Sequence, residues 1–445
     1  MNYHFISIGG SIMHNMAIAM HLKGNKVSGS DDEIFEPAKS NLSKYGLLPE
    51  KTGWQADKIN QDIDTVILGM HAKADNPELL KAQELGLNIV SFPEFIYQNS
   101  IDKKRVVIGG SHGKTTITSM ILHVLKVLNI DVDYLVGAKI PGYDVMVKIT
   151  DSAKLLVVEG DEYLSSALDL RPKFHLYHPH IALLTGIAWD HFNVFPTFEY
   201  YTEQFEIFIN TIEPSGALVY FEQDENLVRL ADKSSNINKI PYDTPDYFVE
   251  DNTFVIKHQN KNYPLKIAGR HNMQNLLGAM KVCEELGISA EDFLRAISSY
   301  AGAAKRMELI KQDDKNIIYR DFAHAPSKVE ATVNAIKEQF PNKKITAVFE
   351  LHTYSSLNKD FIGQYKHTLK SADTRIVFFD PHALELKRLP MLNFDDIRSA
   401  FADDVIVVND VHSLDIEIEK AKNSNEVLLL MSSGNFGGST LVTQI

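Results

Sequence analysis

The stretch "VVIGGSHGKTT", residues 106–116, places a short apolar run before three glycines, one lysine and two threonines. Such a run is typical of a buried strand that leads through a tight turn into a helix. Backbone N–H groups of a glycine-rich turn bind phosphate oxygens, while Lys114 can contact the outer phosphates and Thr115 a magnesium ion. The strict GxxxxGK[ST] pattern needs glycine where this chain has Ile108, so the loop is a shortened variant. We predict a nucleotide-binding loop, with an ordinary strand-to-helix turn as the alternative.

Strands and helices alternate on both sides of this loop. Runs typical of strands precede it at 3–8, 26–31, 64–70 and 87–92, and apolar runs that end in polar or charged residues follow it within 153–163, 180–191 and 216–221. This alternation predicts an α/β fold with mostly parallel sheets. We expect three domains: a Rossmann-like N-terminal domain (1–101), a central P-loop ATPase-like domain (102–301) and a Rossmann-like C-terminal domain (302–445).

Two later segments carry more specific structural predictions. Residues 247–269 alternate like short antiparallel strands around an Asn-Lys-Asn turn at 260–262, and helices should follow near 271–287 and 290–300. In the last domain the apolar spacing predicts helices at 327–340 and near 359–371 between further strands.

Composition excludes several classes of protein. The 445 residues include 45 basic and 58 acidic side chains, a formal charge of -13, so we expect no general binding to nucleic acid or anionic lipid. Cys283 is the single cysteine, which excludes an internal disulfide and fits a reducing compartment. The start of the chain lacks a basic region before its apolar run, and no stretch of about 18 apolar residues occurs. We therefore expect a cytoplasmic protein without membrane insertion.

Acidic and histidine side chains follow two of the predicted strands. Glu159 and Glu162 end the run "VVEGDEY", and Asp190 and His191 lie in "AWDHFNVF". Magnesium prefers oxygen ligands and phosphates, so Glu159 beside Thr115 suits a first magnesium ion. A histidine is a less usual ligand, so His191 as a ligand would indicate a second metal ion. The alternative is a solvated acidic strand end.

The N-terminal stretch "ISIGGSIMHNM" carries a weaker signal. It resembles a dinucleotide-binding fingerprint, but the third glycine is replaced by Ile12. Gly10 and Ser11 can still hold a diphosphate at a helix start. Ser30 and Asp31 end the second predicted strand, where they could hydrogen-bond a hydroxyl of a ribose or another sugar. Plain packing of a strand against a helix is the alternative.

Two further groups of polar residues have a structural alternative as well. In "GRHNMQN", His271, Asn272 and Asn275 can cap a helix or hydrogen-bond a base. The stretches "KRMELI" and "YRDFAHAPSK" contain Arg306, Asp321, His324 and Lys328. A cation from this part of the chain could meet the phosphates of a nucleotide when domains close, and a surface charge pair is the alternative.

Taken together, "GGSHGKTT", "VEGDEY", "WDH", "GRHNMQN", "KRMEL" and "YRDFAHAP" resemble the motifs of the Mur ligases of bacterial cell-wall synthesis, in their order and at roughly their spacing. The resemblance covers nearly the whole chain. Within the family the resemblance is closest to the branch whose ligases act on UDP-N-acetylmuramate. These ligases join either L-alanine or a tripeptide to this sugar. The stretches "IGGSIMHNMA", "RPKFHLYHPHIALLTGIAWDHFNVF" and "MSSGNFGG" favour the tripeptide ligase.

The resemblance implies a role for each domain. The N-terminal domain would bind the UDP-sugar, the central domain ATP and Mg²⁺, and the C-terminal domain the incoming amino acid or peptide. Lys114, Glu159 and His191 would be catalytic, with Thr115, Glu159 and His191 as metal ligands. The implied ATP contacts are Gly110, Ser111, His112, Gly113, Lys114, Thr115, Thr116, His271, Asn272, Asn275, Arg306 and Asp321. The UDP-sugar contacts would be Gly10, Ser11, Ser30 and Asp31, and the acceptor contacts His324 and His352.

Two departures from the family pattern bear on the acceptor and the site. No lysine lies between Lys173 and Lys233, so the carbamylated lysine of several Mur ligases is absent. Where L-alanine ligases tend to have a His-Arg pair, Thr353 follows His352, so a substrate carboxylate would lack a bidentate arginine.

These features predict an ADP-forming amide ligase that joins L-alanyl-γ-D-glutamyl-meso-diaminopimelate to UDP-N-acetylmuramate through an acyl phosphate. The L-alanine ligase is the alternative, and a non-catalytic nucleotide-binding regulator is the alternative of another class. We expect a monomer or a weak homodimer.

Overall fold

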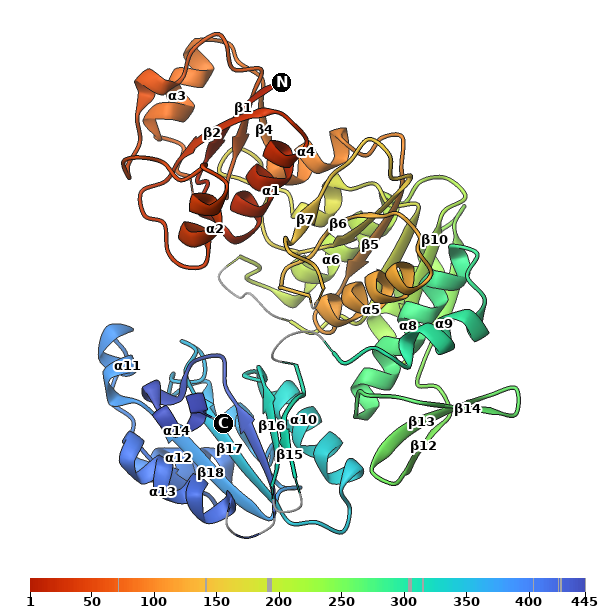
Figure 1. Ribbon diagram of the computed structural model, residues 1–445, viewed down its shortest axis with the longest axis vertical. Coiled ribbons are helices and arrows are strands. Elements are labelled where there is room, and N and C mark those ends of the chain that lie inside the picture. The colour runs from red at the N-terminus through yellow and green to blue at the C-terminus, as the bar shows by residue number, and fades with distance from the viewer. Residues whose placement is uncertain are drawn as a thin grey trace. The chain divides into compact units, whose positions relative to one another are not determined.

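The computed structural model describes residues 1–70, 72–140, 142–189, 194–302, 306–313, 316–402, 404–422, 424 and 426–444. The chain divides into two compact units (Figure 1). The first comprises Met1–Asp243 and Asn275–Ile297, and the second comprises Thr244–Gln274 and Ser298–Ile445. Both contain mostly parallel sheets with flanking helices, which confirms the predicted α/β class.

The first unit begins with a four-stranded parallel sheet in the order β2-β1-β3-β4. Side chains alternate between the two faces, so Phe5 packs with one apolar cluster and Ile6 with another. Helices α1, α2 and α4 contribute to the first cluster and α3 to the second. The elements are β1 (Asn2–Ile6), α1 (Ser11–Leu22), β2 (Lys26–Ser30), α2 (Ala38–Lys44), β3 (Thr65–Leu68), α3 (Pro77–Glu84), β4 (Ile89–Ser91) and α4 (Phe92–Gln98).

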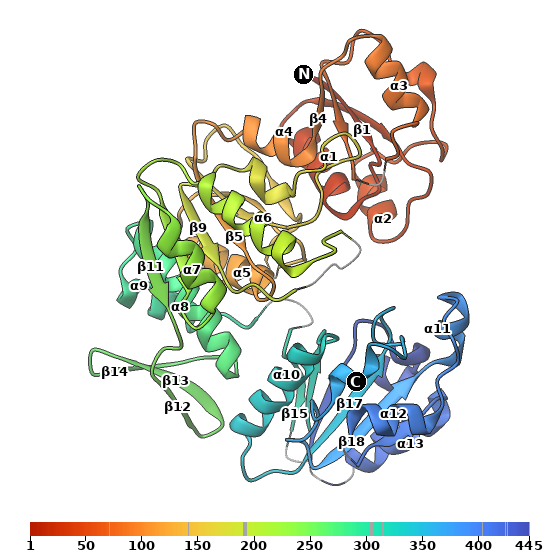
Figure 2. The same ribbon diagram turned by 180° about the vertical axis from the view of Figure 1, so that it is seen from behind.

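A seven-stranded sheet follows in the same unit, in the order β11-β10-β9-β5-β8-β6-β7, with β6 and β7 antiparallel. Helices α5 and α9 lie on one face, and α6 and α7 lie on the other (Figures 1 and 2). Its strands are β5 (Lys104–Gly109), β6 (Asp133–Leu135), β7 (Val147–Lys148), β8 (Leu155–Glu159), β9 (Ile181–Leu184), β10 (Ala217–Phe221) and β11 (Asn238–Tyr242). Its helices are α5 (Lys114–Val127), α6 (Phe198–Asn210), α7 (Glu225–Lys233) and α9 (Ala290–Ile297), and α8 spans Arg270–Glu285.

Strand β5 lies between β8 and β9 near the centre of this sheet. All three run parallel, so their carboxyl ends meet at one edge of the sheet. That edge brings together the glycine-rich loop, the acidic residues after β8 and the segment after β9. Binding sites of parallel α/β sheets form at this edge.

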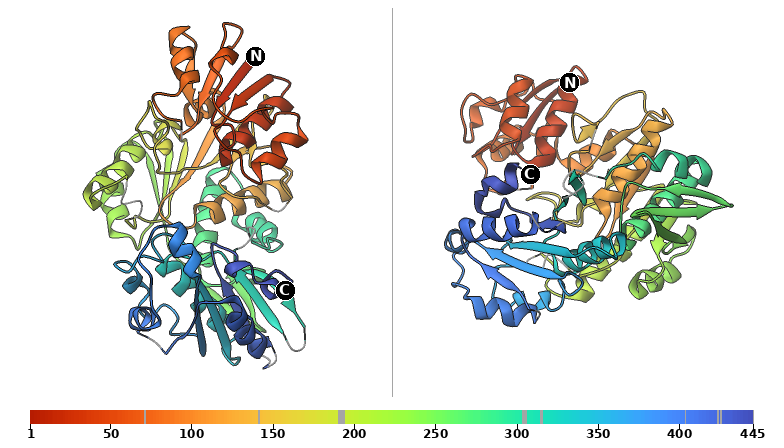
Figure 3. Two further views of the ribbon diagram at one scale, coloured as in Figure 1. Left: turned by 90° about the vertical axis from the view of Figure 1, so that its left-hand side faces the viewer. Right: turned by 60° about the horizontal axis from the view of Figure 1, so that its bottom comes forward.

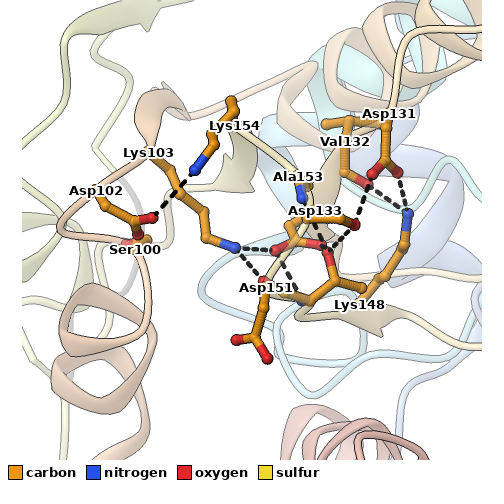
Figure 4. Close-up of polar contacts among 12 residues, drawn as sticks. Ser100, Asp102, Lys103, Asp131, Val132, Asp133, Lys148, Asp151, Ala153 and Lys154 are labelled. Atoms are coloured by element: carbon orange, nitrogen blue, oxygen red, sulfur yellow. Dashed lines mark hydrogen bonds and ion pairs between the residues drawn. The ribbon is translucent and has the colours of Figure 1, made fainter.

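A buried ion pair closes the opposite, amino-terminal end of the same strands (Figure 4). The Lys103 ammonium lies 2.5 Å from Oδ2 of Asp133 and also donates to the carbonyl of Thr150. The backbone N–H and hydroxyl of Thr150 donate to the same carboxylate at 2.9 and 2.8 Å. Both charged side chains are about 2% exposed or less. A second pair, Lys148 with Asp131 at 2.6 Å, lies at the surface.

The second unit contains a three-stranded antiparallel sheet formed by β12 (Tyr247–Glu250), β13 (Thr253–His258) and β14 (Lys261–Pro264). Two-residue turns with positive φ connect the strands, at Asp251–Asn252 and at Gln259–Asn260. The expected antiparallel strands are present, but the predicted Asn-Lys-Asn turn begins one residue earlier, because Asn262 already pairs with β13. The Tyr247 hydroxyl donates to Glu338 at 2.8 Å, which joins this sheet to α10 (Pro326–Gln339).

A six-stranded sheet forms the rest of this unit, in the order β15-β16-β20-β17-β18-β19. Only β15 runs antiparallel among these strands. Helices α10 and α12 contribute to the apolar cluster on one face and α13 to the cluster on the other, so helices cover both faces (Figure 3). The remaining elements are β15 (Glu308–Gln312), β16 (Ile317–Asp321), β17 (Ile345–Leu351), β18 (Thr374–Phe379), α11 (Pro381–Leu386), α12 (Phe394–Phe401), β19 (Ile406–Val408), α13 (Val411–Lys422), β20 (Val427–Met431) and α14 (Thr440–Gln444).

The helix predicted near 359–371 is wrong. Only a 3₁₀ turn, Ile362–Tyr365, forms there, followed by His367 with a positive φ of 61°. The apolar spacing that suggested a helix is real, because Ile362, Tyr365 and Leu369 are all buried in one cluster. The backbone reaches that arrangement through bonds of the i to i+3 type, such as Thr368 N–H to Tyr365 C=O.

Candidate active site

The glycine-rich loop joins β5 to α5 as predicted, and its glycines are needed for two reasons. Gly110 and Gly113 have φ of 108° and 79°, in the region that favours glycine. A Cβ atom would also collide with Thr185 at position 110 and with the amide of Asn275 at position 113. Gly113 is the N-cap of α5, so the N–H groups of the first helical turn remain directed at the loop. This backbone fits an anionic phosphate group.

Lys114 opens α5, and its ammonium has two acceptors within the loop region. It donates to the carbonyl of Gly110 and to Oε2 of Glu162, both at 2.7 Å. Its side chain is 15% exposed, while that of Glu162 is 1% exposed. Burial by itself lowers the pKa of Lys114, but the attraction of Glu162, Asp161 and Glu159 outweighs burial and raises that pKa. Lys114 is therefore a cation next to the loop.

Thr115 contacts Glu159, the carboxylate predicted to lie beside it. Its hydroxyl donates to Oε1 of Glu159 at 2.7 Å, and the N–H of Gly137 donates to Oε2 at 2.7 Å. Burial raises the pKa of Glu159 against these two hydrogen bonds. A hydroxyl and a carboxylate oxygen beside a phosphate loop form a donor set that suits Mg²⁺. Among the described residues, no group of three or more His, Cys, Asp or Glu side chains could hold a metal ion by itself.

The remaining loop residues contact the segment that follows β9. The Ser111 hydroxyl donates to the carbonyl of Ala188 at 2.9 Å and accepts from its N–H at 2.8 Å. His112 and Ser111 line a cavity of about 430 Å³ together with residues 185–188, 221 and 223–226. Thr116 lies in the first turn of α5, where its carbonyl accepts a hydrogen bond from Ser119. Asp190 and His191 lie outside the residues that the structure describes.

Sequence reasoning missed one polar network behind the loop. The Tyr201 hydroxyl of α6 donates to Oε1 of Glu162 at 3.2 Å and lies 3.3 Å from Oγ of Ser111. Tyr201 is fully buried. The run "VVEGDEY" drew attention to Glu162 as one of several acidic residues, but nothing in the sequence pairs Glu162 with Lys114 or with a tyrosine 39 positions later.

The predicted UDP-sugar residues gather at the carboxyl edge of the four-stranded sheet. The N–H of Gly9 donates to Oδ2 of Asp31 at 2.7 Å, next to Gly10, which is the N-cap of α1. The Ser30 carbonyl accepts from the N–H groups of Ser7 and Ile8, and Ser11 is exposed in the first turn of α1. Burial raises the pKa of Asp31 to about 6, with a further contribution from Asp32. Asp31, the residue directly after β2, therefore holds the first loop in place.

The second unit contains the other predicted nucleotide contacts, except for Asn275. Asn272 is buried, and its side-chain amide donates to the carbonyl of Ala268 at 2.8 Å. This bond differs from an N-cap, in which a side-chain oxygen accepts from a backbone N–H. Burial lowers the pKa of His271 to about 4. Oδ2 of Asp321 accepts from Met307 N–H at 2.6 Å, and the guanidinium of Arg306 lies 5.2 Å from the centre of the Phe322 ring.

The candidate acceptor residues lie at the carboxyl edge of the six-stranded sheet. Nδ1 of His352 is 3.7 Å from Oε1 of Glu350, a buried carboxylate at the end of β17. Oε2 of Glu350 accepts from the hydroxyl of Ser432 and, at 2.8 Å, from the N–H of Phe436. The Tyr365 hydroxyl donates to the carbonyl of His324. Glu350 thus ties the loop after β20 to the strand that carries His352.

Three family descriptions match this chain in sequence order. The Mur ligase catalytic domain matches residues 2–103, the Mur ligase middle domain 108–283, and the Mur ligase glutamate ligase domain 305–434. No helix within the described residues has the length and apolar character needed to cross a membrane.

Known proteins resemble the chain over most of its length. The UDP-N-acetylmuramate–L-alanine ligase of Caldicellulosiruptor bescii is 31% identical, with 87% of this chain and 85% of that protein covered. The crystal structure of MurC from Thermotoga maritima has a TM-score of 0.72 at 22% identity, covering 99% of this chain and 97% of that one. The murein peptide ligase Mpl from Psychrobacter arcticus has a TM-score of 0.63 at 21% identity, with the same coverage. The chain therefore belongs to the Mur ligase family, whose members are ATP-dependent ligases that form amide bonds.

Proposed function

We propose that this protein joins the tripeptide L-alanyl-γ-D-glutamyl-meso-diaminopimelate to the lactyl carboxylate of UDP-N-acetylmuramate, with ATP as the third substrate. The observation that carries the ligase chemistry is the arrangement at the carboxyl edge of the seven-stranded sheet. There a lysine, a helix N-terminus and the Thr115–Glu159 pair surround one phosphate loop. These groups supply positive charge and hydrogen-bond donors where a phosphoryl group would transfer.

The reaction requires two bond-forming steps. A lactyl carboxylate oxygen attacks the γ-phosphorus of ATP, ADP leaves, and an acyl phosphate results. The peptide amine then attacks the acyl carbon, loses a proton and displaces phosphate through a tetrahedral intermediate. Lys114 and the first-turn N–H groups of α5 orient the phosphates and balance their charge during transfer.

Thr115 and Glu159 would hold a magnesium ion, which neutralises phosphate charge when it is bound. We propose His191 as a ligand of a second ion. We also propose that Gly10, Ser11, Ser30 and Asp31 contact the UDP-sugar. The nucleotide contacts assigned to His271, Asn272, Arg306 and Asp321 stay predictions.

Position 353 supports a peptide over a single amino acid as the acceptor. The Thr353 hydroxyl accepts from the backbone N–H of Ser356 at 3.1 Å and donates to its hydroxyl at 2.9 Å. This side chain caps a turn and offers no guanidinium fork for a substrate carboxylate beside His352. The L-alanine ligase remains the second candidate, because relatives at about 30% identity carry that name.

One assay separates the three readings: phosphate release from ATP with Mg²⁺ and UDP-N-acetylmuramate, with either L-alanine or the tripeptide added. We expect release with the tripeptide. Release with L-alanine alone would favour the second candidate, and no release with either would favour a nucleotide-binding regulator.

Two variants test the roles of single residues in this assay. Lys114→Ala should abolish ADP formation, whereas Lys233→Ala, at an exposed lysine of the same unit, should not. His191→Ala should impair turnover with ATP binding kept, and an unchanged magnesium dependence would disprove its metal role.

A further inference from the structure

The two ring nitrogens of His352 have different surroundings. His352 directly follows β17, and its side chain is 36% exposed. A Cβ atom on Gly434 would lie 2.5 Å from Nδ1 and 2.6 Å from Cγ, so the backbone of the loop after β20 packs against this edge of the ring. Nε2 is the ring atom opposite that edge. The exposed part of the imidazole therefore carries Nε2.

Glu350 faces the covered nitrogen of the same ring. Its Oε1 lies 3.7 Å from Nδ1 of His352, and its side chain is 2% exposed. The other oxygen, Oε2, accepts from the hydroxyl of Ser432 and, at 2.8 Å, from the N–H of Phe436. The N–H of Gly434 donates in turn to the Ser432 hydroxyl at 2.6 Å. The loop after β20 thus holds the carboxylate with Oε1 directed at the imidazole.

This arrangement decides which nitrogen of a neutral imidazole carries the proton. A proton on Nδ1 is stabilised by the negative charge of Oε1, whereas a lone pair on Nδ1 would be repelled by it. Nε2 then keeps its lone pair, at the exposed edge of the ring. A histidine held in this tautomer by a carboxylate is oriented to accept a proton from a bound group.

The second step of the proposed reaction needs such a proton acceptor. The α-amino group of the acceptor is mostly an ammonium ion at neutral pH and must lose one proton before it attacks the acyl carbon. In the tetrahedral intermediate the attacking nitrogen carries a further proton that the amide product lacks. Once the nitrogen has lost that proton, phosphate leaves with the electron pair of the C–O bond. A positioned base accelerates a step of this kind by about 100-fold to 10,000-fold.

We propose that His352 is the general base of amide formation and that Glu350 is its positioning residue. Nε2 of His352 takes a proton from the acceptor nitrogen, Glu350 balances the charge of the resulting imidazolium, and the exposed ring releases the proton to water. This role rests on the proposed function. It holds for the tripeptide and for L-alanine alike, because both present the same α-amino group.

Hydroxylamine separates the base from the rest of the site. It is uncharged at neutral pH, and its nitrogen becomes strongly acidic on attack, so it converts an acyl phosphate to a hydroxamate without a general base. With ATP, Mg²⁺ and UDP-N-acetylmuramate present, two rates are measured for each variant: amide formation with the acceptor, and hydroxamate formation with hydroxylamine. For His352→Gln we expect amide kcat to fall at least about 100-fold and the hydroxamate rate to stay within about threefold.

The outcomes of this experiment are distinct. Equal losses of amide and hydroxamate in His352→Gln, or an amide rate close to wild type, would overturn the role of His352. Wild-type protein that forms neither product would instead contradict the acyl phosphate of the proposed function. His382→Gln is the matched control, because His382 lies 3.6 Å from Glu385 in an exposed pair of the same unit, and both of its rates should equal those of wild type.

Glu350→Gln tests the positioning role with little change of shape. The amide oxygen can accept from Ser432 and Phe436, so the amide NH₂ faces Nδ1 of His352 and moves the ring proton to Nε2. We expect amide kcat to fall about 100-fold, with KM for the acceptor and the hydroxamate rate within about threefold of wild type. Glu385→Gln is the control and should change neither rate. A higher KM with unchanged kcat would show that Glu350 only shapes the loop, and would overturn the proposal.

Discussion

The hydroxyl of Thr115 and the carboxylate of Glu159 form a hydrogen bond of 2.7 Å between the first turn of α5 and the end of β8. Thr115→Val keeps the shape of the side chain and removes the hydroxyl. We expect kcat/KM to fall at least about 100-fold, or about 3 kcal/mol, with a higher magnesium requirement, because an oxygen ligand is lost. Thr115→Ser retains the hydroxyl and should stay within about tenfold of wild type. Steady-state kinetics across a magnesium titration would measure both, and equal losses in the two variants would argue against a hydroxyl role.

The loop after β20 packs so closely against His352 that a Cβ atom at position 434 would require a neighbouring side chain to move. A Cβ atom on Gly434 would lie 2.5 Å from Nδ1 of His352 and 2.9 Å from Oε2 of Glu350. Gly434→Ala should therefore displace His352 and raise KM for the acceptor at least about tenfold, while the affinity for ADP stays constant. Gly363→Ala is the matched control, because nothing lies within 4 Å of a Cβ atom there. A parallel loss of ADP affinity would place the effect outside the acceptor site.

Asp31 makes the stability of the protein depend on pH. Its pKa is about 6 in the folded protein, above the unfolded value of about 3.9, so the folded state binds the proton more tightly. This stabilisation is complete below the unfolded pKa and is lost as the pH rises through 6. Between pH 5 and 8 it decreases by about 1.4 kcal/mol. Urea unfolding of Asp31→Asn and wild type at both pH values should show the variant gaining this amount relative to wild type, and parallel pH dependences would contradict it.

Lys103 and Asp133 form a buried pair whose disruption should destabilise the first unit. Lys103→Met leaves the Asp133 carboxylate buried without its cation, and we expect a loss of about 3–5 kcal/mol in the free energy of unfolding. Lys148→Met breaks a surface pair of similar distance and should cost under about 1 kcal/mol. Chemical denaturation of both variants tests the difference, and comparable losses would show that burial is not the cause.

The sequence predicted most of the fold because its signals are local. Apolar runs such as "RVVIGG" become buried strands wherever a sheet forms, and turn glycines such as Gly110 and Gly113 are required by their own backbone angles. The segment near 359–371 shows the limit of this reasoning. Its apolar spacing fits a helix, yet packing of Tyr365 against Phe349 and Phe401 is reached through a 3₁₀ turn.

The candidate site divides in the same way. Lys114, Thr115 and Glu159 follow from sequence alone, because a phosphate loop and an acidic strand end predict their own chemistry. The residues that contact this site from distant parts of the chain could not be predicted from the sequence. Tyr201 lies 39 residues from Glu162 and Asn275 lies 162 residues from Gly113, at distances along the chain where no local pattern operates.

The amino-acid sequence by itself determined the class of fold, the glycine-rich loop between a strand and a helix, and the family, since each depends on short-range order along the chain. Tertiary structure alone decided that Lys114 is paired with Glu162, that Asp31 holds the first loop and that Glu350 of β17 is bonded to the loop after β20. The physical reason is that hydrogen bonds and ion pairs between buried groups depend on which strands become neighbours in a sheet. Strand neighbours are set by packing of the whole domain and not by the residues next to each group.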